Sequence, residues 1–126
     1  TFTSALVTSL GRFLPSSSAI LSTVDKADCF YQALLVAMGY ATNIMAHLAP
    51  ALKARTVLNL YVTGRLSSDE FVHDMLPTTL AHNAHYMQAA KDAGVCIWFL
   101  SMADKEVAIY NSPADGMATR VYIGYH

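Results

Sequence analysis

The chain has 126 residues, of which 54% are hydrophobic and 13% are charged, and its formal net charge is −1. This length predicts a single domain over residues 1–126, and the composition supports one apolar core and excludes a disordered chain. No basic block is present, so nucleic acid is not an expected partner. The longest apolar runs are far too short to cross a bilayer, so no membrane segment is expected.

The first 23 residues form a mixed segment that we expect to be an N-terminal extension or lobe. Phe2, Leu6 and Leu10 recur at helical spacing, which predicts a short amphipathic helix there. The segment lacks the basic-then-apolar order of a signal peptide. The two cysteines of the chain are too few for a disulfide scaffold, which favours a reducing compartment, the cytosol.

A loop running into a helix is predicted over residues 25–39. Asp28 is expected to cap the helix, with its carboxylate facing the unpaired backbone N–H groups of the first turn. Cys29 would then be the first helical residue, and Gly39 would end the helix. A second helical stretch begins at Thr42, is reset by Pro50 and continues to Gly64.

Two further helices are predicted before the pattern changes. Ser67 and Glu70 have the spacing of a capping box, which predicts the start of a third helix. Pro77 is expected to open a fourth helix, which ends near Gly94.

After Gly94 the sequence predicts strands. Residues 95–100 form a continuous apolar run rich in β-forming residues, typical of a buried strand. Residues 106–110 follow a polar turn and predict a hairpin, and residues 120–125 alternate as a third strand does. Because the helices come first and the strands last, we expect an α+β fold, with N-terminal helices packed on a small, mostly antiparallel C-terminal sheet.

Cys29 is the first candidate for chemistry. A thiol reacts as thiolate, and a helix N-terminus lowers the thiol pKa through its unpaired N–H groups and its dipole. The same N–H groups can stabilise an oxyanion, so the position suits nucleophilic catalysis as well as simple packing. Cys96 lies inside the apolar run and is expected in the core; a disulfide between the two cysteines stays open.

A cysteine nucleophile needs a base, normally histidine. His82 and His85 lie three residues apart and could share a metal, but a zinc site needs more ligands than these two, so we expect no metal and no cofactor. His126 differs from the mid-helix histidines because it follows a strand. A strand end beside a helix N-terminus is how papain-like folds bring histidine to cysteine.

Three motifs resemble the ovarian-tumour (OTU) cysteine proteases. Residues 28–34, Asp-Cys-Phe-Tyr-Gln-Ala-Leu, are similar to the box around the OTU nucleophile. Residues 90–99 resemble the helix end and central strand of the family, followed by the strand carrying residues 109–111, and residues 121–126 resemble its last strand and catalytic histidine. The likeness covers about residues 24–126 and is greatest to the viral OTU-like domains of replication polyproteins, of the tymovirus type.

This resemblance implies a papain-like OTU fold and a thiol protease. It implies that Cys29 is the nucleophile and His126 the base, with the loop of Lys26, Ala27 and Asp28 at the oxyanion. Asp25 and Asn111 are candidates for orienting His126.

The resemblance also implies the substrates. They are ubiquitin, cut after its C-terminal tail, and a viral polyprotein cleavage site, in the host cytosol. Two alternatives stay open. One is a papain-like, self-releasing viral leader protease that uses His82 or His85, and the other is an inactive protein-binding module.

Overall fold

The computed structural model describes residues 28–101, 106–112 and 119–125. The predicted N-terminal extension and its amphipathic helix lie outside these residues. The elements, in chain order, are α2 (Cys29–Ala37), α3 (Thr42–Val62), α4 (Ser68–Asp74), α5 (Asn83–Ala93), β1 (Val95–Ser101), β2 (Glu106–Tyr110) and β3 (Thr119–Tyr125). Helices precede strands, so the predicted α+β order is confirmed. No helix in the described ranges is long and apolar enough to span a membrane.

The three strands form one mixed sheet in the order β2-β1-β3. The hairpin of β1 and β2 is antiparallel, as predicted, whereas β3 pairs with β1 in parallel. The expectation of a mostly antiparallel sheet was therefore wrong. Tyr110 pairs with Ile97 and Thr119 pairs with Val95, so the chain leaves β2 and enters β3 at the same end of β1. A strand that starts at that end, on the other side of β1, has to run parallel to β1.

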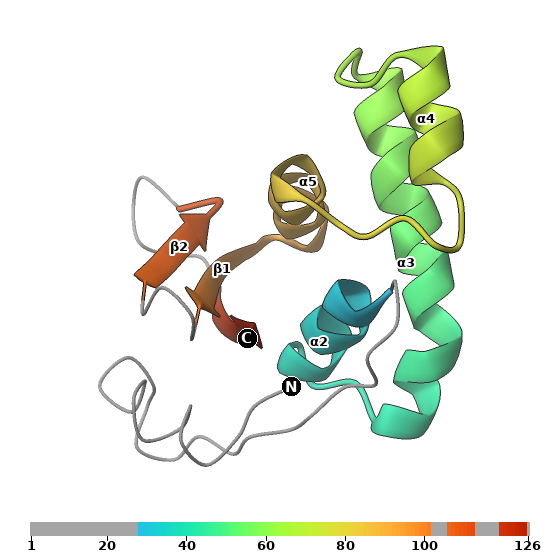
Figure 1. The fold of residues 1–126 in the computed structure, drawn as a ribbon. Helices are drawn as coiled ribbons and strands as arrows, with labels where there is room; N and C mark the ends of the chain where they lie inside the picture. The colour runs from blue at the N-terminus through green and yellow to red at the C-terminus, as the bar shows by residue number, and fades with distance from the viewer. Residues whose placement is uncertain (1–27, 102–105, 113–118, 126) are drawn as a thin grey trace, which may run out of the picture.

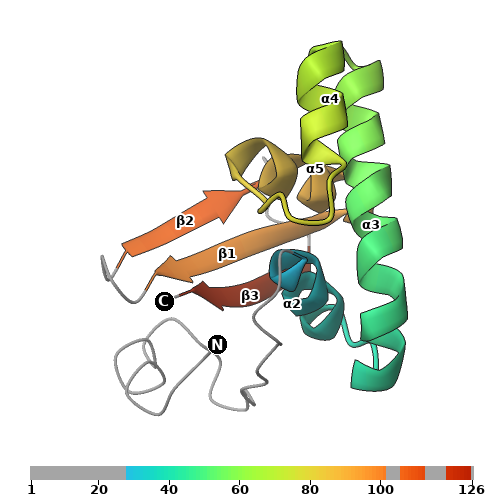
Figure 2. The same ribbon diagram turned by 45° about the vertical axis from the view of Figure 1, so that its right-hand side comes forward.

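Helices α2 and α5 pack on the sheet, and α3 packs on the side of these two helices that is away from the sheet, with α4 beside it (Figures 1 and 2). Figures 1 and 2 both place α2 beside β3. The main core joins α2, α3, α5, β1 and β3, and its buried members are Phe30, Tyr31, Leu34, Leu35, Met45, Ala49, Leu52, Ala89, Ala90, Val95, Ile97, Val121 and Ile123. The helix that carries Cys29 is thus held on both sides, by α3 and by the last strand.

Glycine ends two of the helices where the sequence predicted. Gly39 follows α2 with φ of 97° and Gly94 follows α5 with φ of 69°, both in the left-handed region. A side chain disfavours this conformation, so glycine is the residue that lets the chain turn off the helix there. Because the helix ends at Gly94, β1 begins at the next residue, Val95, and packs against α5.

Pro50 does not begin a new helix, which corrects one expectation. α3 runs unbroken for 21 residues with Pro50 inside it. A proline in a helix interior removes one hydrogen bond and crowds the preceding turn. Met45, Ala49 and Leu52 are buried in the core on both sides of the proline, and this packing stabilises the helix across the defect.

Pro77 does not open a helix either. α4 ends at Asp74, and α5 begins only at Asn83, so eight residues lie between the two helices. The intervening loop is held from α3 by Lys53, whose Nζ donates to the carbonyl oxygens of Leu76 at 2.7 Å and Thr79 at 2.9 Å. These tertiary hydrogen bonds use backbone carbonyls that a helix would need for itself. The predicted capping box of Ser67 and Glu70 at the start of α4 is confirmed.

Candidate functional site

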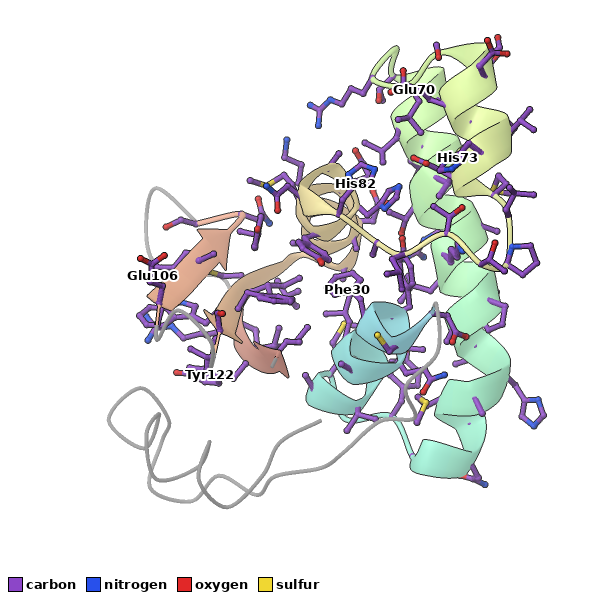
Figure 3. The ribbon with its side chains drawn as sticks, viewed as in Figure 1. Phe30, Glu70, His73, His82, Glu106 and Tyr122 are labelled. Carbon is purple, nitrogen blue, oxygen red and sulfur yellow. The ribbon has the colours of Figure 1, made fainter. Side chains whose placement is uncertain are left out.

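Cys29 is the first residue of α2, as predicted, and its side chain is half-buried. The helix turns its apolar side inward, with Phe30 at 6% and Leu34 at 0% exposure. Figure 3 shows Phe30 between α2 and α5, where its ring lies 4.5 Å from that of Tyr86. The packing of this face fixes the helix, and with it the position of the Cys29 thiol at the end where the helix dipole is positive.

Asp28 occupies the N-cap position but does not act as expected. Its side chain makes no capping hydrogen bond to the first turn of α2. Its Oδ1 instead accepts a hydrogen bond of 2.9 Å from Nε2 of Gln32, one turn further along the helix. Gln32 is 4% exposed, so this contact is made largely out of water. The expectation that the carboxylate faces the first-turn N–H groups was therefore wrong.

Next to Asp28 in space is a polar cluster that the sequence did not predict. Lys53 on α3 is 7% exposed. Burial is the larger effect and lowers the pKa of Lys53, against the opposing charges of Asp28 and Asp74. Tyr31 on α2 is fully buried, and burial together with the negative charge of Asp74 raises its pKa above the ordinary range. Charged side chains on α3 and α4 therefore act on residues of the Cys29 helix, in addition to its apolar packing.

Asp74, the last residue of α4, is the centre of this cluster. Its Oδ2 lies 3.0 Å from Nε2 of His85 and 3.4 Å from Nε2 of His82, and its Oδ1 lies 3.2 Å from Nδ1 of His73. His73 comes from α4 and His82 from the turn into α5 (Figure 3). Burial by itself raises the pKa of Asp74, but the hydrogen bonds from the histidines outweigh it, so the pKa lies below its usual range.

The hydrogen bonds of His85 define its protonation. Its Nδ1 accepts the backbone N–H of His82 at 3.1 Å, so the proton of the neutral ring is on Nε2 and is donated to Asp74. Burial lowers the pKa of His85 and the charge of His82 lowers it further, against the effect of Asp74. The ring is therefore neutral, with both nitrogens engaged and an exposure of 1%.

This arrangement bears on two roles considered for the histidines. Asp74, His82 and His85 place one ligand atom each within 4.8 Å of one another. A metal on Nε2 of His85 would remove the hydrogen bond to Asp74 and force the single proton of the neutral ring onto Nδ1, where it would oppose the His82 N–H. For the same reason His85 offers no nitrogen to a thiol. The hydrogen bond between His85 and Asp74 instead joins α5 to α4.

The predicted base follows β3. Tyr125 ends that strand and pairs with Ser101 at the end of β1. His126 lies outside the described residues, as do Asp25, Lys26 and Ala27. Their roles at the base, the oxyanion and the orienting position therefore stay predictions.

Asn111, the other residue named for orienting His126, is described. It has φ of 61° and donates through Nδ2 to the carbonyl oxygen of Val95 at 3.0 Å. Val95 and Ser101 are at opposite ends of β1, six residues apart, or about 20 Å at the usual rise of a strand. Asn111 is thus at the far end of the sheet from Tyr125.

Cys96 lies on β1 and is 4% exposed, so its predicted place in the core is confirmed. No disulfide joins the two cysteines. Cys29 is the more exposed of the two, which is what a nucleophile requires.

Sequence reasoning missed two residues of this region, Gln32 and Asp74. Gln32 lies four residues after Asp28, a spacing at which helical side chains meet, so this pair had a readable signal. Asp74 lies 8 and 11 residues before His82 and His85, across a loop, and no local period connects them.

Comparisons with known proteins agree with this architecture. No protein-family model and no curated protein sequence matches the chain. Among solved structures, the OTU domain of OTUD1 is similar, with a TM-score of 0.65 and 12% sequence identity. The match covers 83% of this chain and 77% of that one. At this identity the likeness shows the fold, and the chain has an OTU-like α+β fold.

Proposed function

We propose that the chain is an OTU-type cysteine protease that acts as a deubiquitinase. The observation that carries the proposal is the placement of Cys29 as the first residue of α2, with α2 packed against β3, the strand that leads to His126. The OTU-like fold supports it, because the solved domain of similar fold is an OTU domain. The thiol is half-buried, at a helix end that stabilises negative charge.

In the proposed reaction His126 takes the proton of the Cys29 thiol, and the thiolate attacks the carbonyl carbon of the scissile amide. The tetrahedral oxyanion is stabilised by the Cys29 backbone N–H and by the loop of Lys26, Ala27 and Asp28. His126 then returns the proton to the leaving amine, and water hydrolyses the thioester. Loss of one oxyanion donor costs about a hundred-fold or more in rate in enzymes of this kind.

The proposed substrate is the C-terminal tail of ubiquitin, as an extended chain in a narrow groove. We extend the proposal to cleavage of a viral polyprotein by the same site in the host cytosol, on the resemblance of the short, compact layout of the chain to that of the viral OTU-like domains. Incubation with peptides that span polyprotein junctions, read by mass spectrometry, tests this second activity.

Reaction with a ubiquitin carrying a C-terminal electrophile tests the assignment of residues. We expect a covalent adduct on Cys29, lost in Cys29→Ala and kept in the matched Cys96→Ala variant. His126→Ala is expected to abolish labelling and His85→Gln to keep it. Labelling that survives Cys29→Ala would refute the nucleophile, and labelling that survives His126→Ala would move the base elsewhere.

A binding module without activity is the competing reading. A fluorogenic ubiquitin substrate separates the two, because the protease releases the fluorophore and the module does not. Retained binding of ubiquitin, with no turnover and no adduct, would favour the module.

A further inference from the structure

The geometry points to Gln32 as a positioning residue that keeps the Asp28 carboxylate off the N-terminal turn of α2 and so keeps the Cys29 thiol reactive. The inference rests on the proposed function for its catalytic meaning. Its physical content, the acidity of one thiol, is measured without any substrate.

An aspartate in the N-cap position normally accepts a hydrogen bond from the N–H of the second or third helical residue. In α2 those residues are Phe30 and Tyr31. Asp28 makes no such bond, although its backbone is already at the helix start, where its carbonyl accepts the N–H of Gln32 at 3.0 Å. Its carboxylate is held by the Gln32 side chain at 2.9 Å. The default cap is therefore replaced by a specific contact.

The direction of the Gln32 amide follows from charge. Its Nε2 faces Oδ1 of Asp28, and the reverse orientation would oppose two acceptors. Its Oε1 is buried, with no hydrogen-bond partner among the described residues. An unsatisfied buried oxygen destabilises the fold. Gln32 thus keeps its contact with Asp28 at some expense of stability, which is unusual for a residue that only packs.

The contact matters because of where the carboxylate would otherwise sit. A carboxylate on the first turn of α2 would occupy N–H groups of that turn and would place a negative charge beside the Cys29 sulfur. Both effects disfavour the thiolate and raise the thiol pKa. Two other charged groups act on or are acted on by residues of this region: Lys53 on α3, which feels the charge of Asp28, and Asp74 on α4, which acts on Tyr31. Neither is on α2, so replacing Gln32 leaves both side chains in place.

Gln32→Met is the matched variant, because methionine keeps the length of the side chain but donates no hydrogen bond, and it also removes the unpartnered oxygen. The measurement is the rate of alkylation of Cys29 by iodoacetamide between pH 5 and 10, followed on the Cys29 peptide by mass spectrometry. We expect the midpoint of this pH–rate profile, which reports the thiol pKa of Cys29, to rise by about half a pH unit to one pH unit. This shift lowers the alkylation rate at pH 6 by about 3- to 10-fold. Thermal unfolding is expected to change little.

Asp28→Ala gives the background that decides the role. Without the carboxylate, Gln32→Met is expected to leave the midpoint unchanged, and Asp28→Ala alone is expected not to raise it. A merely structural glutamine would lower the melting temperature and leave the midpoint in place. A midpoint shift that is equal in both backgrounds, no shift in a folded Gln32→Met variant, or a rise in Asp28→Ala would each overturn the inference.

The two proposals fail separately. Alkylation requires no ubiquitin, so a midpoint shift in a chain that is inert to ubiquitin probes would uphold the role of Gln32 and refute the deubiquitinase. Normal ubiquitin cleavage with an unshifted midpoint would uphold the deubiquitinase and refute the role of Gln32.

Discussion

His85 donates its Nε2–H to Asp74 across 3.0 Å, and this bond joins the start of α5 to the end of α4 with the histidine side chain only 1% exposed. A neutral donor suits this place, because protonation would put a second proton on Nδ1, where the His82 N–H already points. The pair therefore stabilises the fold in one protonation state.

The first prediction concerns pH. Burial, with the charge of His82, lowers the pKa of His85 in the folded chain below its ordinary 6.5, so below about pH 6.5 the unfolded chain binds the extra proton. The contribution of His85 to the free energy of unfolding is fully present above that pH. It decreases as the pH falls, by up to about 1.4 kcal/mol per pH unit. Asp74, whose pKa is also lowered, adds a further loss below about pH 4. Urea denaturation at pH 3–8 measures both losses.

The variant His85→Gln tests whether His85 causes this decrease in stability with falling pH. Glutamine can accept the His82 N–H and donate to Asp74, but it does not titrate. We expect the loss between pH 6.5 and 5 to become smaller, while His47→Gln, at an exposed position of α3, serves as the control for removing one histidine. An unchanged slope in His85→Gln would contradict the prediction.

The second prediction concerns Lys53, which binds two carbonyl oxygens of the loop between α4 and α5. Lys53→Met keeps the buried aliphatic stem and removes both hydrogen bonds. Hydrogen bonds from a charged donor contribute about 1.5–3 kcal/mol each in favourable cases, so we expect a loss of about 2 kcal/mol. Limited proteolysis should then cut the loop at residues 75–82 sooner, whereas Lys91→Met, on the exposed side of α5, should leave the loop as resistant as before.

Sequence reasoning succeeded where the signal is local. Glycines with left-handed φ, a serine–glutamate cap and a run of β-forming residues act within a few positions, and the corresponding helix ends and strands were predicted. Pro50 and Pro77 were misread because their effects depend on distant groups: core packing carries α3 through the first, and Lys53 holds the second in a loop. The direction of β3 was missed for a similar reason, since it depends on which side of β1 the strand joins.

The same contrast between local and distant signals applies to the candidate site. Cys29 at a helix start follows from the residues on either side of it. The orientation of the Asp28 carboxylate does not follow from neighbouring residues. Both the helix cap and the contact with Gln32 are local interactions, and the sequence does not show which of the two is more favourable. The convergence of three histidines on Asp74 requires two helices to pack, which no periodicity encodes.

The third prediction concerns the capping box of α4. Ser67 accepts the N–H of Glu70 at 3.2 Å, and Glu70 accepts the N–H of Ser67 at 3.0 Å. Ser67→Ala removes one of these bonds and is expected to lower the free energy of unfolding by about 1 kcal/mol. Thr78→Ala, at an exposed position in the following loop, should cost less than half of that in the same thermal denaturation experiment. Equal losses for both would argue against the cap as the cause.

The parallel pairing of β1 and β3 also provides an optical reporter. Trp98 is the single tryptophan of the chain; it pairs with Tyr122, and the Arg120 guanidinium lies 4.1 Å from its ring centre. Detachment of β3 removes both neighbours from the indole and changes its emission, whereas far-ultraviolet dichroism follows the helices. Comparing the two signals during unfolding reveals whether the last strand leaves together with the helices or before them.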